Sequence, residues 1–236
     1  MFALCRICTC EEFGGDGCII STRPLDVPPS TPPVDDEDRS LADLEHFLAT
    51  LTRVAGSGRI GLLLEVFGAA PARILEVDSD ETTAAGSYNA SAPDELQLRP
   101  GDYIVDAAGQ AASSASIPKA LASSSSAITV LIVRPVLFAV TFSRKHERLG
   151  LSLKQNKGGK CILIEAVEFE DAKQAASVDL QQGDRILSVN GVSGDVPGML
   201  CELDSSDDIC LEISRAVLPP SGLRDMSKCL SDVVAG

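Results

Sequence analysis

Tryptophan is absent from this chain of 236 residues, and aromatic residues make up only 4% of it. A core must therefore be built from Leu, Ile, Val and Ala, which suits a small aliphatic sheet domain. Only His46 and His146 could serve as imidazole bases, no serine lies in a Gly-x-Ser-x-Gly turn, and no glycine-rich loop carries the lysine and hydroxyl of a phosphate-binding loop. The sequence therefore predicts a protein that is not an enzyme and uses no metal or other cofactor.

Positive charge is also scarce, because 20 Lys and Arg residues stand against 34 Asp and Glu, for a formal net charge of -14. Binding to nucleic acid relies on a basic stripe that neutralises phosphates, so nucleic acid is excluded as a partner. No apolar run approaches the roughly 18 residues of a spanning helix, and residues 1–10 lack the pattern of a secretory signal. The expected location is the cytoplasm, where thiols stay reduced.

One sequence pattern occurs twice in the chain. Arg-Ile-Gly-Leu at residues 59–62 leads to Gly-Asp-Tyr-Ile at 101–104, and Arg-Leu-Gly-Leu at 148–151 leads to Gly-Asp-Arg-Ile at 183–186. A repeat that carries no catalytic groups indicates a binding module that is used twice. We therefore expect an N-terminal tail at 1–44, a divergent first domain at 45–135, a second domain at 136–217 and a C-terminal tail at 218–236.

Apolar and alternating runs predict a mainly β fold with short helices. Residues 40–51 fit both helical and strand spacing, and the repeat favours a strand that begins at residue 47. Residues 78–95 are longer than their counterpart in the second copy and rich in Ala, Ser and Thr, so we expect an inserted surface loop. The predicted strands are 47–53, 61–66, 72–77, 103–107, 128–133, 137–143, 150–154, 161–167, 185–189 and 209–214; the predicted helices are 117–123, one near 171–176, 196–203 and a short one in the C-terminal tail.

The N-terminal tail combines several prolines, an acidic run at 35–38 and four cysteines. Such a stretch cannot bury enough apolar surface to order itself. Cys5, Cys8 and Cys10 lie beside apolar residues and are candidates for S-acylation (palmitoylation), which would hold the chain peripherally on a membrane. A zinc site that also uses Cys18, and unmodified thiols, are the alternatives.

The predicted elements follow one another as a strand, a Leu-Gly-Leu loop, two strands, a short helix, a Gly-Asp-Arg-Ile strand, an Asn-Gly turn, a helix and a strand. This order resembles that of a PDZ domain. The resemblance covers residues 137–215 well and residues 47–134 less closely. It implies two tandem PDZ-like, partly open antiparallel β-barrels, each with about two α-helices. It also implies a non-enzymatic scaffold or adaptor that binds the C-terminal tails of partner proteins by adding them as a strand in a groove. A regulatory PDZ module that controls a separate enzyme, such as a protease, is the alternative.

The resemblance places the groove between the strand after the Leu-Gly-Leu loop and the last helix. The ligand's carboxylate would meet the backbone amides of that loop, and apolar walls imply a preference for apolar-ended ligands. Asp-Ala-Ala-Gly at 106–109 departs from the family's Val-Asn-Gly, so the second unit is expected to be the working groove, unless a tail blocks it. The candidate peptide-binding residues are Arg148, Leu149, Gly150, Leu151, Ser152, Leu153, Val196, Leu200 and Leu203 in the second unit, and Arg59, Ile60, Gly61, Leu62, Leu64, Ile117 and Leu121 in the first.

Overall fold

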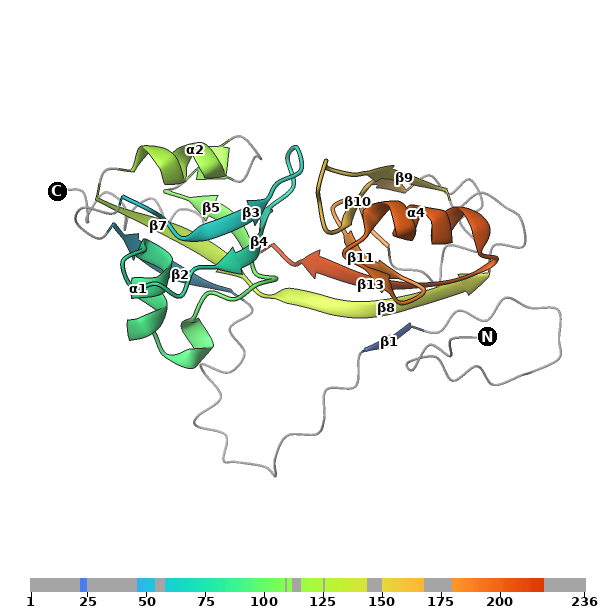
Figure 1. Cartoon of the computed structure of the whole chain (residues 1–236), viewed down its shortest axis with the longest axis horizontal. Helices are drawn as coiled ribbons and strands as arrows, with labels where there is room; N and C mark the ends of the chain where they lie inside the picture. The colour runs from blue at the N-terminus through green and yellow to red at the C-terminus, as the bar shows by residue number, and fades with distance from the viewer. Residues whose placement is uncertain are drawn as a thin grey trace, which may run out of the picture. The chain divides into compact units, whose positions relative to one another are not determined.

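The computed structural model of the chain describes residues 22–24, 46–53, 58–108, 110–111, 116–124, 126–143, 150–167 and 180–218. The chain divides into two compact units whose main segments are Ser30–Val136 and Leu137–Arg215. Each unit is built around one antiparallel sheet with short helices packed on it (Figure 1). The predicted fold class, mainly β with short helices, is confirmed.

The first unit contains a sheet in the order β2-β7-β5-β4-β3, with β6 paired to β5. Figure 1 shows α1 and α2 on opposite sides of these strands. Both helices contribute to one core, in which Ala84 of α1 and Ile117 of α2 pack with Leu51, Ile74 and Ile132 of the sheet. The elements are β2 (His46–Thr52), β3 (Leu62–Glu65), β4 (Ala72–Val77), α1 (Ala84–Ser91), a 3-10 helix η1 (Asp94–Leu96), β5 (Tyr103–Ala107), β6 (Gln110–Ala111), α2 (Ser116–Ser123) and β7 (Ala127–Val133).

The second unit repeats this arrangement, with its strands in the order β8-β13-β11-β10-β9 and β12 paired to β11. A three-residue strand that the sequence did not predict, β1 (Thr22–Pro24), pairs antiparallel with β8. The core of the second unit includes Ile164, Ile186, Leu211 and Met199. The elements are β8 (Pro135–Ser143), β9 (Leu151–Lys154), β10 (Ile162–Val167), β11 (Arg185–Val189), β12 (Val192–Ser193), α4 (Val196–Ser205) and β13 (Asp208–Ala216).

The two units agree in strand register as well as in strand order. The pairing of β5 with β7 shifts register between Ile104 and Asp106, and the pairing of β11 with β13 shifts between Ile186 and Ser188. The pairings of β3 with β4 and of β9 with β10 also carry one register shift each. Because the same irregularities recur at matching places, the two units share one fold.

A buried aspartate anchors each unit at the start of its Gly-Asp strand. The aspartate pairs with an arginine at or directly after the end of the last strand of the unit, and the guanidinium lies 4.9 Å (first unit) or 4.8 Å (second unit) from the centroid of a phenylalanine ring on the first strand. The aspartate also accepts a hydrogen bond of 2.8 Å from a backbone N–H three residues earlier. We call this set the Asp-Arg-Phe anchor; its members are Asp102, Arg134 and Phe47 in the first unit and Asp184, Arg215 and Phe138 in the second.

Residues 78–95 are not the surface loop that the sequence predicted, because they contain α1 and η1. Thr83 caps α1 by accepting a hydrogen bond of 3.1 Å from the Gly86 N–H, and Ala84 and Ala85 are buried in the core. The small side chains allow this close packing, while their composition gave α1 no apolar stripe that sequence reasoning could detect. A helix that is capped by Thr83 and buries Ala84 and Ala85 in the core therefore takes the place of the predicted loop.

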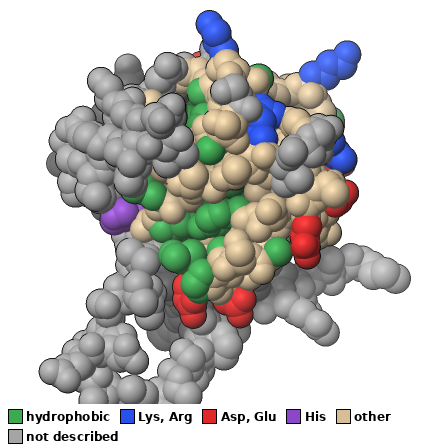
Figure 2. Space-filling view, turned by 90° about the vertical axis from the view of Figure 1, so that its left-hand side faces the viewer, with side chains coloured by type: hydrophobic (Ala, Val, Ile, Leu, Met, Phe, Trp, Pro, Cys, Tyr) green, Lys and Arg blue, Asp and Glu red, His purple; other side chains and the backbone are tan. Residues whose placement is uncertain are grey.

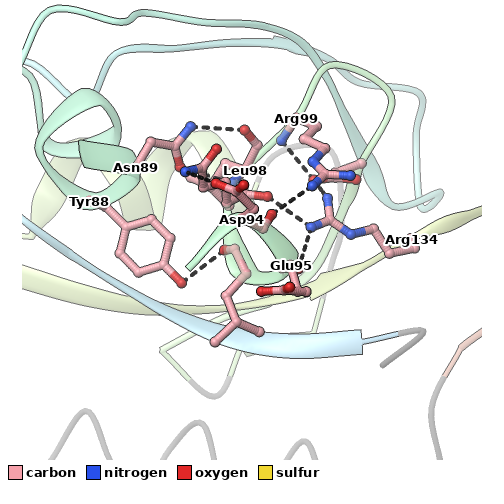
Figure 3. Close-up of polar contacts among 10 residues, drawn as sticks. Tyr88, Asn89, Asp94, Glu95, Leu98, Arg99 and Arg134 are labelled. Carbon is pink, nitrogen blue, oxygen red and sulfur yellow. Dashed lines mark hydrogen bonds and ion pairs between the residues drawn. The ribbon is translucent and has the colours of Figure 1, made fainter. Parts of the chain in front are cut away.

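Polar contacts connect α1 to η1 and to the residues that follow η1 (Figure 3). The Asn89 side chain donates to the Leu98 carbonyl oxygen at 2.9 Å and accepts from the Leu98 N–H at 2.8 Å. The Tyr88 hydroxyl donates to the Leu96 carbonyl oxygen at 3.1 Å, and Arg134 donates to the Glu95 carbonyl oxygen at 2.8 Å. These bonds satisfy backbone groups that a short helical segment leaves unpaired.

Several predictions concern residues outside the described ranges. These are the helix near 171–176, the helix in the C-terminal tail and the cysteines Cys5, Cys8 and Cys10. Among the described residues, no helix is long and apolar enough to cross a membrane. The described part of the chain also contains no cluster of three or more His, Cys, Asp or Glu side chains that could hold a metal ion.

Candidate peptide-binding groove

Strand β9 forms one edge of the sheet in the second unit. Within the described residues it pairs with β10 alone, so its other side presents backbone groups that a further strand can pair with. Leu151, Ser152 and Leu153 are half-buried, and Lys154 is exposed. An extended chain can therefore be added along β9.

The start of β9 lies next to a glycine in the left-handed region. Gly150 has φ of 60°, a conformation that other residues adopt only with strain. The candidates Arg148 and Leu149 lie outside the described residues. The left-handed conformation of Gly150 fits the predicted carboxylate site, which remains a prediction.

The apolar wall of the groove comes from β9 and α4. Leu151 and Leu153 of β9 pack in one hydrophobic cluster with Val196, Leu200 and Leu203 of α4. Val196 is 4% exposed and Leu203 is 2% exposed, whereas the other three are only partly buried. The structure therefore brings these five predicted pocket residues together. Leu151, Leu153 and Leu200 keep exposed surface that a ligand can contact.

Helix α4 begins without a side-chain cap. Asp195 occupies the N-cap position, but its carboxylate accepts no capping hydrogen bond, and Pro197 lies in the first turn. A Cβ placed on Gly198 would lie 2.6 Å from an Asp195 carboxylate oxygen, so that carboxylate folds over the first turn of the helix. The helix dipole stabilises a negative charge at this end.

An open hollow of about 550 Å³ lies beyond the last residue of β9. Its lining consists of the β9–β10 turn, residues 155–160, and the start of α4, residues 194–197. Among the described residues that line it, Lys157 and Lys160 are basic and Asp195 is acidic. Sequence reasoning did not single out this hollow, although Lys154, Lys157 and Lys160 are three of only seven lysines in the chain.

In the first unit, the corresponding residues pack together more completely. Ile117 and Leu121 of α2 are 0% and 5% exposed, and Ile60, Leu62 and Leu64 are packed against the same cluster. Figure 2 shows the end of this unit that carries α1 and α2: hydrophobic side chains gather in the middle of the face, with basic side chains above them and acidic ones below. The predicted residues of the first groove are thus brought together, with the two helix residues buried in the core and the strand residues partly buried, as Leu151 and Leu153 are in the second unit.

Backbone hydrogen bonds tie the Arg-Ile-Gly-Leu loop of the first unit to α1. The N–H groups of Ala84 and Ala85 donate to the carbonyl oxygens of Arg59 and Ile60 at 3.1 and 2.9 Å, and the Asp78 N–H donates to the Gly61 carbonyl oxygen at 2.8 Å. Gly61 has φ of 79°, and a Cβ there would lie 2.5 Å from the Thr83 hydroxyl oxygen. The loop cannot move without breaking its contacts to α1.

Arg53 follows β2 directly and binds the end of α2. Its guanidinium donates to the carbonyl oxygens of Ser124 at 2.8 Å and Leu121 at 2.7 Å, at the end of α2. These bonds satisfy carbonyl groups that the last turn of a helix leaves free. The protein's own hydrogen bonds therefore hold the loop to α1 and the end of α2 to Arg53.

Comparison with known families identifies the second unit. Residues 139–196 match the family model of the PDZ domain, which spans β8 to the start of α4. The second unit therefore is a PDZ domain, and the first unit shares its strand order, register and Asp-Arg-Phe anchor.

Two solved structures are similar to the chain at low identity. One is described as the complex structure of INAD PDZ45 and NORPA CC-PBM, with 17% identity, a TM-score of 0.34 and coverage of 73% of this chain and 91% of that chain. The other is described as the structure of INAD PDZ45 in complex with NG2 peptide, with 16% identity, a TM-score of 0.31 and coverage of 74% and 93%. At these low values neither structure assigns a ligand to this chain. A comparison with curated protein sequences finds no match.

Proposed function

We propose that the second unit binds the C-terminal tails of partner proteins, and that the chain acts as a non-enzymatic scaffold or adaptor. The observation that carries this proposal is the edge strand β9 beside α4, with half-buried leucines of both elements in one cluster. A ligand strand gains backbone hydrogen bonds along β9, and these give affinity without reading the ligand's sequence. Its last side chain packs on Leu151, Leu153 and Leu200.

The preference for apolar-ended ligands follows from the chemistry of these walls. Val196 offers no hydrogen-bond donor at the first position of α4, so a polar side chain in the ligand beside it would lose water without gaining a partner. Gly150 and the loop before it receive the ligand's carboxylate, with Arg148 adding attraction. We expect the first unit to bind such tails weakly or not at all, because its loop is tied to α1.

The experiment measures fluorescence polarisation of labelled C-terminal peptides from a library with the full chain. Peptides that end in Val, Leu or Ile should bind, and amidating their carboxylate should abolish binding. Binding of amidated and free peptides with equal affinity would contradict recognition of the terminus.

A pair of variants on α4 tests the position of the site. Leu200 lies partly exposed in the leucine cluster, whereas its neighbour Cys201 is exposed on the helix. Leu200→Glu should abolish binding of apolar-ended peptides, because it places a charge against the ligand's last side chain. Cys201→Glu makes the same chemical change one residue away and should leave affinity unchanged. Equal loss in both variants would place the ligand elsewhere.

A further inference from the structure

The hollow beside β9 differs in charge from the protein as a whole. The formal net charge of the chain is -14, yet the turn from Lys154 to Lys160 contains three lysines and no acidic residue. The Lys154 ammonium pairs with the Glu165 carboxylate at 3.1 Å, and both side chains are about half exposed. Lys157 and Lys160 line the hollow, and the carboxylate of Asp195 is turned over the first turn of α4.

The direction of a bound tail determines which of its residues reach this hollow. If the carboxylate lies at Gly150, the ligand must run antiparallel to β9, which is four residues long. The last ligand residue then lies near Leu151, and the residue about three positions earlier lies near Lys154, at about 3.4 Å per residue. The residues about four to six positions before the terminus therefore pass the turn and its hollow.

We propose that Lys157 and Lys160 select ligands with Asp or Glu about four to six positions before an apolar C-terminus. This inference rests on the proposed function of the second unit and adds a specificity that the leucine walls cannot supply. Attraction between a basic turn and an acidic ligand segment strengthens binding and speeds encounter, and added salt weakens both effects. An open hollow with two lysines can accept carboxylates without burying either charge completely, so desolvation costs little.

The test uses the full chain and matched pairs of apolar-ended peptides that carry either Asp or Asn at the fourth to sixth positions before the terminus. Asn has the same shape as Asp without its charge. At low salt the Asp peptide should bind about three- to tenfold more tightly than the Asn peptide, the range expected for two exposed ion pairs. The difference should shrink as salt is added, because exposed charges are screened.

Lysine variants assign the effect to the hollow. In the double variant Lys157→Gln, Lys160→Gln the two peptides should bind equally, with the affinity of the Asn peptide unchanged. Lys119→Gln removes an exposed lysine on α2 of the first unit and should preserve the advantage of the Asp peptide.

Each outcome separates the two proposals. Equal binding of both peptides to the unaltered chain, or an Asp advantage that survives in the double variant, overturns the acidic preference and leaves groove binding intact. If neither peptide binds, or if amidated peptides bind as well as free ones, the proposed groove itself is overturned, and the acidic preference with it.

Discussion

Replacing Gly86 with alanine should destabilise the first unit, although helix propensity alone predicts the opposite. Gly86 lies inside α1, where the change to alanine ordinarily stabilises a helix by about 1 kcal/mol. Here the added Cβ would lie 2.2 Å from the carbonyl oxygen of Asp80 and 2.7 Å from its carbonyl carbon. Contacts this short force either the helix or the backbone of Asp80 to move.

The magnitude follows from what holds Asp80 in place. Its carbonyl oxygen accepts hydrogen bonds from the Thr83 N–H at 2.9 Å and from the Thr83 hydroxyl at 2.8 Å. Losing these two bonds costs about 1 kcal/mol each, and overpacking adds about 1 kcal/mol or more. After the gain in helix propensity, we expect Gly86→Ala to lower the free energy of unfolding of the first unit by about 2 kcal/mol.

The chain contains its own probe for this measurement. Tyr88 and Tyr103 are its only tyrosines, both lie in the first unit, and there is no tryptophan. Urea unfolding followed by tyrosine fluorescence therefore reports on the first unit alone. Ser87→Ala, at the next position of the same helix, should be neutral or stabilise by at most about 0.5 kcal/mol. A Gly86→Ala protein as stable as the unaltered chain would refute the close packing of α1.

Two further predictions concern the Asp-Arg-Phe anchors. Burial raises the pKa of Asp102, although Arg134 lowers it, so ionisation of Asp102 removes folding stability as the pH rises from below 3.8 through the folded-state pKa. The free energy of unfolding of Asp102→Asn minus that of the unaltered chain should therefore increase over this pH range. A difference that does not depend on pH would contradict the burial effect. Arg215→Lys should destabilise the second unit by about 2 kcal/mol, because a lysine cannot reproduce both 2.8 Å hydrogen bonds to the buried Asp184. Hydrogen exchange in β11 and β13 measures this loss, and Arg59→Lys, at an exposed single contact, is the control and should change stability by less than about 0.5 kcal/mol.

The strands could be predicted because their apolar alternation and the repeat point to the same positions. Each predicted strand occurs, and β4, β5 and β11 have the predicted bounds. Helices α2 and α4 were also predicted, and each carries apolar residues and a proline in its first turn. The two-residue strands β6 and β12 are too short to show any alternation.

The parts of the structure that the sequence did not reveal depend on contacts between distant residues. Helix α1 is stabilised by two buried alanines and by the side chain of Asn89, which bonds a backbone nine residues away. The local sequence pattern of residues 78–95 does not predict these contacts. The leucine walls of the second groove were predicted from the resemblance, but the basic hollow was missed because its residues come from the β9–β10 turn and the start of α4.

The repeated anchor explains how two units with one fold can differ so much at their grooves. In both units the phenylalanine lies on the first strand, the aspartate directly precedes the fourth strand, and the arginine lies at or directly after the end of the last strand; none of the three lies on β3, on β9 or on the last helix. The fold therefore does not depend on an open groove. In the first unit the loop before β3 is bound to α1 and serves as structure. In the second unit, β9 keeps an edge available within the described residues, and the same architecture can then support recognition.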